Sequence, residues 1–222
     1  MQFNYCEFAG DESLVLSTKE YSHIFKVRRV VVGAELNFCN LKDRKIYLYK
    51  IESIDKKEAI LALKSFENLK ESSTSKIHVG WCVVDPKIVE KHIAMLNEMG
   101  VQKISFVYSD FSQKNYVIDE KRIKRILINS CEQSGRSNLM EFEIIKSVKE
   151  FLRIYSKSVV IDFSERYLEN EDKIDSFLVG PEGGFSQKER DLFKSRDIFG
   201  LKSPNILRSE TAVVGICGKI IL

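Results

Sequence analysis

The most constraining feature of the sequence is the stretch 177–190, which is typical of a buried strand, a glycine turn and the start of a helix. Residues 177–179 form a short apolar run closed by a glycine, as in a strand buried on both faces. Two further glycines follow, and glycine lets a ligand approach the main chain closely. Ser186 and Glu189 form a capping box, which predicts a helix beginning at Gln187. Because open α/β sheets bind ligands where their strands end, the turn is a candidate ligand site.

A second stretch, residues 205–212 (N-I-L-R-S-E-T-A), has the same design. Ile206 and Leu207 predict a short strand that ends in a polar turn, followed by a helix that runs to Leu222. Neither stretch contains the spacing of a phosphate loop or of a dinucleotide fingerprint. From local chemistry alone, an ordinary glycine-rich turn remains open as an interpretation of residues 180–184.

The overall composition excludes some classes of protein but does not indicate a binding partner. A net charge of +3 over 222 residues does not by itself indicate a nucleic-acid partner, so any basic surface must be local. The five cysteines are scattered without a C-x-x-C pair, which predicts no metal site and no disulfide framework. Free thiols, no signal-peptide pattern and no membrane-length apolar run lead us to expect a cytoplasmic protein.

The chain divides into two parts by pattern. Residues 1–66 contain several short alternating runs, which predict a small β-barrel. Residues 65–75 turn small and polar and are predicted to be the linker. From Lys76 onward strands and helices alternate, which predicts an α/β domain with a mainly parallel sheet. We therefore expect domains at 1–70 and 71–222. The predicted strands of the second domain are 77–84, 101–107, 159–162, 177–180 and 206–207.

Two helices of this domain have clear ends. Asp85 followed by Pro86 is a cap and first helical position, and Gly100 closes that helix. Asp119 opens the second helix and Gly135 is its predicted C-terminal cap.

Together, G-P-E-G-G-F-S-Q-K-E and I-L-R-S-E-T-A resemble the knotted SPOUT-class RNA methyltransferases. A third stretch, E-Q-S-G-R-S at 132–137, is similar to the ribosomal RNA small subunit methyltransferase E family. The resemblance runs in weaker form over nearly the whole chain. It implies methylation of N3 of one uridine in 16S rRNA of the assembled 30S subunit, with S-adenosyl-L-methionine as the cofactor and no metal. It also implies a trefoil knot, whereas sheet rules alone would predict an unknotted Rossmann-like sheet.

The resemblance assigns roles to individual residues. Catalytic roles are expected for Arg136, Arg208 and Glu210, where an arginine could stabilise charge on the uracil carbonyls. The expected cofactor-binding residues are Leu178, Val179, Gly180, Pro181, Glu182, Gly183, Gly184, Ile206, Leu207, Arg208, Ser209, Thr211 and Ala212. Gln133 and Arg136, at the end of the helix that Asp119 opens, are expected to contact RNA.

A basic cluster in the first domain is a further RNA-binding candidate. Lys26, Arg28 and Arg29 lie beside Tyr21 and Phe25 on a predicted short helix. Cations beside aromatic rings suit RNA, because they pair phosphate charge with base stacking. A solvated helix face would have the same composition. The family's N-terminal PUA-like domain has a similar pattern, so the resemblance favours the RNA interpretation.

The last helix also predicts a homodimer. Its apolar residues exceed what one buried stripe needs, and knotted methyltransferases of this class place the cofactor site beside a two-fold interface. The residues concerned are Val213, Val214, Ile216, Cys217, Ile220 and Ile221.

The chain departs from the family pattern at three places: Met95, the segment 110–112 (D-F-S) and Met140. These departures bear on RNA contacts and leave both cofactor motifs intact. Three alternatives stay open: a related methyltransferase acting on another RNA, a non-catalytic RNA-binding assembly factor, and a Rossmann-like small-molecule enzyme. The missing dinucleotide fingerprint disfavours the last of these.

Overall fold

The computed structural model describes residues 3–17, 21, 24–25, 29–69, 75–169 and 172–222. Its chain forms two compact units, one of residues 1–72 and 128–139 and the other of residues 73–127 and 140–222. The expected boundary near residue 70 thus has an exception, because residues 128–139 group with the N-terminal unit.

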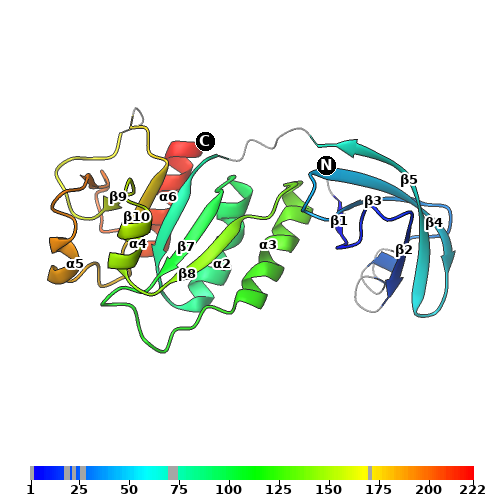
Figure 1. The fold of residues 1–222 in the computed structure, drawn as a ribbon, viewed down its shortest axis with the longest axis horizontal. Coiled ribbons are helices and arrows are strands. Elements are labelled where there is room, and N and C mark those ends of the chain that lie inside the picture. Colours follow the sequence, from blue (N-terminus) through cyan, green and yellow to red (C-terminus); the bar gives the residue numbers. More distant parts are fainter. Residues whose placement is uncertain (1–2, 18–20, 22–23, 26–28, 70–74, 170–171) are drawn as a thin grey trace. The chain divides into compact units, whose positions relative to one another are not determined.

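The N-terminal unit is built on a five-stranded sheet in the order β1-β3-β4-β5-β2 (Figure 1). Side chains alternate between a buried and an exposed face, as in β2, where Leu14 and Leu16 are buried and Val15 is exposed. The core gathers the inward residues, among them Phe38 and Tyr49. The strands are β1 (Asn4–Tyr5), β2 (Ser13–Ser17), β3 (Glu35–Cys39), β4 (Lys45–Ile54) and β5 (Glu58–Asn68).

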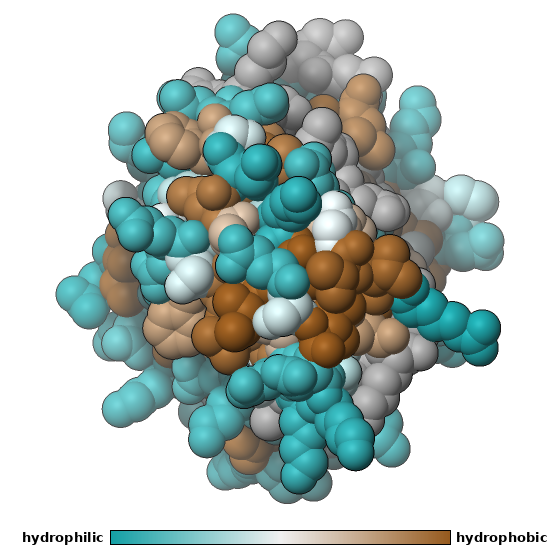
Figure 2. Space-filling view, turned by 90° about the vertical axis from the view of Figure 1, so that its right-hand side faces the viewer, coloured by the Kyte–Doolittle hydropathy of each residue, from teal (hydrophilic) through white to brown (hydrophobic). Residues whose placement is uncertain are grey.

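The outer face of this sheet keeps apolar side chains in contact with solvent. Val15 and Ile60 are direct partners in the β2–β5 register and are 61% and 37% exposed. Figure 2 views the side on which β2, β4 and β5 lie in Figure 1, and shows apolar side chains gathered among hydrophilic ones.

The second unit contains a six-stranded sheet in the order β11-β9-β10-β6-β7-β8, in which every pairing is parallel. Its strands are β6 (His78–Cys82), β7 (Lys103–Val107), β8 (Glu141–Ile145), β9 (Val159–Ile161), β10 (Ser176–Val179) and β11 (Ile198–Phe199). The predicted parallel sheet is therefore confirmed.

Helices cover both faces of this sheet. They are α2 (Pro86–Glu98), α3 (Glu120–Ser134), α4 (Val148–Ile154), α5 (Gln187–Asp191) and α6 (Ser209–Ile221). Neighbouring residues of β6 show the two faces, since successive side chains of a strand point in opposite directions. Gly80 lies against Phe151 of α4, whereas Trp81 donates a hydrogen bond to Ser209 of α6. α4 and α6 therefore pack on opposite faces of the sheet.

Capping residues in the sequence predicted the ends of these helices correctly. Asp85 caps α2 by accepting from the amide of Lys87, with Pro86 as the first helical residue. Gly100 has a φ of 93°, a conformation that glycine adopts without strain. The capping box of Ser186 and Glu189 is present at the start of α5. Asp119 accepts from the amide of Arg122 ahead of α3.

Several expectations for the second unit were wrong. Ile206 and Leu207 form no strand: both are exposed, Ile206 by 82%, and the sheet ends instead at β11, which the sequence analysis missed. Two apolar residues after Pro204 are too short a run to distinguish a strand from a loop. β8 and α4 were also not predicted, and the last helix, α6, begins at Ser209.

Two expectations for the first unit also need correction. The predicted linker overlaps β5, which continues to Asn68, while residues 70–74 lie outside the described residues. Of the predicted short helix, Ile24 and Phe25 are helical, whereas Lys26 and Arg28 lie outside the described residues. Arg29 is exposed and has a φ of 53°, which is not a right-handed helical conformation.

Candidate cofactor and RNA site

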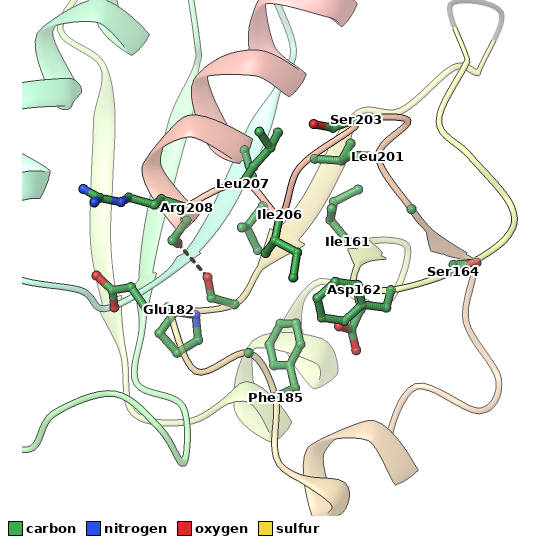
Figure 3. Close-up of a pocket in the computed structure, with 18 of the residues that line it drawn as sticks. Ile161, Asp162, Ser164, Glu182, Phe185, Leu201, Ser203, Ile206, Leu207 and Arg208 are labelled. Carbon is green, nitrogen blue, oxygen red and sulfur yellow. Dashed lines mark hydrogen bonds between the residues drawn. The ribbon is translucent and has the colours of Figure 1, made fainter.

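A cavity of about 870 Å³ lies at the carboxyl ends of β9 and β10 (Figure 3). Three segments form its walls: residues 161–167 after β9, 179–185 after β10, and 200–212, which lead into α6. Carboxyl ends of parallel strands meet at one edge of a sheet, so segments distant in sequence converge there. The volume is within the range of pockets that hold small molecules and cofactors.

Most of the predicted cofactor-binding residues line this cavity. They are Val179, Gly180, Pro181, Glu182, Gly183, Gly184, Ile206, Leu207, Arg208, Ser209 and Ala212. Leu178 and Thr211 do not line it: Leu178 is fully buried in the core under the sheet, and Thr211 is exposed on α6.

The wall after β9 was not predicted from the sequence, and neither were Phe185, Arg190 and the lining residues of 200–205. The missed residues are Ile161, Asp162, Phe163, Ser164, Glu165, Tyr167, Phe185, Arg190, Gly200, Leu201, Ser203, Pro204 and Asn205. One signal pointed toward Asp162, which is the last residue of a predicted parallel strand. Residues 200–205 have no comparable signal, because only the pairing of β11 with β9 brings them to the site.

Two walls of the cavity are joined by one hydroxyl group. Ser209 is 5% exposed, accepts from the indole nitrogen of Trp81 at 3.0 Å and donates to the carbonyl oxygen of Gly180 at 2.6 Å. The first turn of α6 is thereby fixed to β6 and to the glycine turn. Buried hydroxyls and indole groups need such partners, so this contact holds the walls in register.

An ion pair joins the wall after β9 to the wall after β10. The guanidinium of Arg190 donates to Asp162 Oδ1 at 3.2 Å and, through Nε, to the carbonyl oxygen of Phe185 at 3.2 Å. The side chain of Asp162 is only 10% exposed and that of Arg190 is 39% exposed. The segment after β9 is thus tied to the end of the glycine turn by charge as well as by packing.

Two charged side chains, those of Glu182 and Arg208, stand at one side of the cavity. In Figure 3 the side chains of Glu182 and Arg208 both extend away from the apolar residues Ile161 and Ile206. Glu182 and Arg208 are exposed. Glu210 is 7% exposed and is not a lining residue, and its Oε2 has no hydrogen-bond partner among the described residues. Of the predicted catalytic residues, the structure therefore places only Arg208 on the cavity wall.

Arg136, the other predicted catalytic residue, belongs to the N-terminal unit. It is 6% exposed and its Nε donates to the carbonyl oxygen of Asn138 at 2.9 Å; burial lowers the pKa of its guanidinium. Its neighbour Gln133 is exposed on the last turn of α3. Glu132, the first residue of the motif, accepts from the amide of Tyr5 at 2.7 Å and so links α3 to β1.

The structure offers no cluster for a metal among the described residues, since no group of three His, Cys, Asp or Glu side chains converges there. Within the same residues, none of the helices has the length and apolar character needed to cross a bilayer. The five cysteines are free thiols.

The comparisons identify the class of protein to which this parallel sheet, its cavity and the small β unit belong: they are those of a two-domain RNA methyltransferase. The family described as RNA methyltransferase domain matches residues 70–221, and the family described as RNA methyltransferase PUA domain matches residues 16–64. Proteins named Ribosomal RNA small subunit methyltransferase E are similar over almost the full length. Those of two Helicobacter pylori strains are 39% and 40% identical, and each match covers 96% of both chains. The chain belongs to the ribosomal RNA small subunit methyltransferase E family.

Solved structures share the fold. A probable rRNA-methyltransferase from Porphyromonas gingivalis superposes with a TM-score of 0.85 at 22% identity, covering 98% of this chain and 96% of that one. A Ribosomal RNA small subunit methyltransferase E from Neisseria gonorrhoeae, bound to S-adenosyl methionine, superposes with a TM-score of 0.81 at 19% identity, covering 98% and 95%.

Proposed function

We propose that this protein methylates N3 of a specific uridine in the 16S rRNA of the assembled 30S subunit, using S-adenosyl-L-methionine. Membership of the ribosomal RNA small subunit methyltransferase E family is the observation that carries the proposal. The cavity supports it, because two of its three walls contain the motifs, 178–184 and 206–212, that the family resemblance assigns to the cofactor.

The cavity suits this cofactor chemically. Apolar side chains such as Ile161 and Leu201 can cover an adenine ring, and the main chain of the glycine turn offers amide and carbonyl groups to its edge. When bound, the cofactor would supply an electrophilic methyl group. Little covalent chemistry is then asked of the protein, so orientation and charge placement dominate. Arg208, exposed on the cavity wall, would stabilise negative charge on a uracil carbonyl.

RNA recognition is assigned to side chains of the N-terminal unit, in both of the segments that form it. Lys26, Arg28 and Arg29 would contact phosphates, and Gln133 with Arg136 would act near the target. The burial of Arg136 supports a positioning role, since its guanidinium holds the turn at Asn138. The cytoplasm and a homodimer complete the proposal, together with the trefoil knot, which stays a prediction. On α6 the residues Val214, Ile220 and Ile221 are half-buried in a single chain, and a two-fold contact would cover them.

The test is transfer of a labelled methyl group from the cofactor to 30S particles and to deproteinised 16S rRNA, followed by nucleoside analysis. We expect N3-methyluridine, formed faster on the particle, because a folded substrate presents the uridine already positioned. A methyl group on a ribose oxygen or on a guanine would contradict the proposal. Light scattering at micromolar concentration tests the dimer: a monomer mass would count against it.

A matched pair of variants tests the cavity. Leu201→Trp adds volume to the wall and should weaken cofactor binding in calorimetry, while Leu192→Trp changes a similarly apolar, partly exposed residue that does not line the cavity. Equal affinities of the two folded variants would place the cofactor elsewhere.

A further inference from the structure

The loop that follows β7 is fastened to the segment that carries the glycine turn. The amide of Asp110 donates to Glu189 Oε1 at 2.9 Å, and the hydroxyl of Ser186 donates to Asp110 Oδ2 at 2.5 Å. At the other end of the loop, the hydroxyl of Ser112 donates to the carbonyl oxygen of Val83 at 2.9 Å. Residues 110–112 are therefore held in one place at the carboxyl edge of the sheet.

Glu189 is the centre of this arrangement. It is 5% exposed, and while Oε1 accepts from Asp110, Oε2 accepts from the amide of Ser186 at 2.9 Å as part of the capping box. One buried carboxylate thus fixes both the start of α5 and the loop after β7. A buried carboxylate keeps such a position because each of its oxygens is satisfied.

Phe111 stands between these anchors with its ring against the glycine turn. A Cβ built on Gly183 would lie 3.3 Å from Phe111 Cβ and 3.5 Å from two carbons of its ring. Phe111 is nevertheless 53% exposed. Gly183 lines the cavity, so a fixed aromatic ring lies beside the cavity wall and keeps much of its surface in solvent.

We infer that Phe111 is a stacking platform for an RNA base beside the cofactor cavity. The inference rests on the proposed function and deepens it. An enzyme that modifies the ring of a base needs that base out of its stack, and unstacked RNA bases are held against aromatic side chains. A phenylalanine can bind any base in this way, because it offers a face and no hydrogen bonds. Phe111 is thus a positioning residue, and base identity is left to polar groups such as Arg208 and Glu182.

The experiment compares Phe111→Trp, Phe111→Leu and Phe111→Ala with wild type on 30S particles. Leucine keeps an apolar contact with Gly183 but cannot stack, so kcat/KM for the particle should fall by roughly tenfold or more, while tryptophan should stay near wild type. The Kd for S-adenosyl-L-methionine should remain within about twofold in all three variants. Val117→Ala is the control, because Val117 is a 71% exposed apolar residue further along the same connection.

Each other outcome overturns the inference. If the leucine variant is as active as wild type, the ring does not stack on RNA. If cofactor affinity falls in parallel with activity, the ring only supports the glycine turn. If Phe111→Ala changes the mass in light scattering, the ring belongs to a protein contact. Failure of wild type to methylate any 30S particle would overturn the proposed function as well, whereas an active wild type with an active leucine variant overturns this inference alone.

Discussion

The indole nitrogen of Trp81 donates a 3.0 Å hydrogen bond to the hydroxyl of Ser209, which lies 128 positions later in the chain. The same hydroxyl donates to Gly180. Ser209→Ala should lower the free energy of unfolding by about 1–3 kcal/mol, because it leaves a buried N–H without its partner. Chemical denaturation followed by the fluorescence of this single tryptophan measures the change.

Thr211→Ala is the matched control for Ser209→Ala. Thr211 lies on the same turn of α6 and is exposed, so its replacement should change stability by no more than about 0.5 kcal/mol. Similar losses in both variants would mean that the turn itself, and not the buried hydroxyl, responds to substitution.

Gly80 predicts a packing effect inside the sheet. A Cβ at this position would lie 2.5 Å from Phe151 Cζ, and both residues are in the core, so Gly80→Ala should destabilise by about 1–3 kcal/mol through overpacking. Phe151→Leu removes the clashing ring atoms. In a double-mutant cycle the loss from Gly80→Ala should therefore be smaller in the leucine background, and additive losses would contradict the predicted contact.

The local chemistry of the candidate site could be predicted from the sequence. The capping box of Ser186 and Glu189, the glycine turn and the strand before it depend on residues within a few positions of one another, and all three are present. The second role of Glu189, as acceptor for Asp110, could not be predicted. It depends on the order of strands in the sheet, which no local pattern records.

The same limit explains the missed part of the cavity. Asp162 and Arg190 meet because β9 pairs with β10, and Leu201 reaches the site because β11 pairs with β9. For Ile206 and Leu207 the error was the opposite one, because a strand was predicted where the chain forms a loop. They are apolar, but they lie exposed at the cavity, and an exposed apolar pair looks like a short buried strand in a sequence.

His78 predicts how stability depends on pH. It is buried at the start of β6, where its ring contacts the hydroxyls of Ser105 and Ser176. Burial is the main cause that lowers the pKa of His78 from 6.5 to about 4; the charge of Lys103 acts in the same direction and that of Glu143 acts against it. The unfolded chain therefore binds the proton first as the pH falls.

The contribution of His78 to the free energy of unfolding should therefore be at its maximum above pH 6.5, and it should be lost as the pH drops from 6.5 toward about 4. His78→Gln keeps a polar side chain that does not titrate. The denaturation midpoint should therefore change less with pH between these two values than it does in wild type. An unchanged slope in His78→Gln would assign the pH dependence to other groups.

The basic cluster of the N-terminal unit predicts a salt effect. Replacing Lys26, Arg28 and Arg29 together by glutamine should weaken RNA binding and flatten its dependence on salt, because each lost phosphate contact lowers the log–log slope by roughly 0.7 to 0.9. Filter binding over a range of salt concentrations measures this slope. If the triple variant has the wild-type slope, the cluster does not contact RNA phosphates and is an ordinary solvated surface.

The ion pair between Asp162 and Arg190 leads to the last prediction. Because it ties the segment after β9 to the carbonyl of Phe185, Asp162→Asn should loosen the end of the glycine turn and weaken S-adenosyl-L-methionine binding by roughly tenfold, or about 1.4 kcal/mol. Asp197→Asn is the control: the side chains of Asp197 and its partner Arg166 are 61% and 57% exposed, and such pairs contribute little. Calorimetry on both variants decides the matter. Equal affinities would show that packing alone holds the cavity walls, and that the charge of Asp162 is not needed to keep the turn in its binding position.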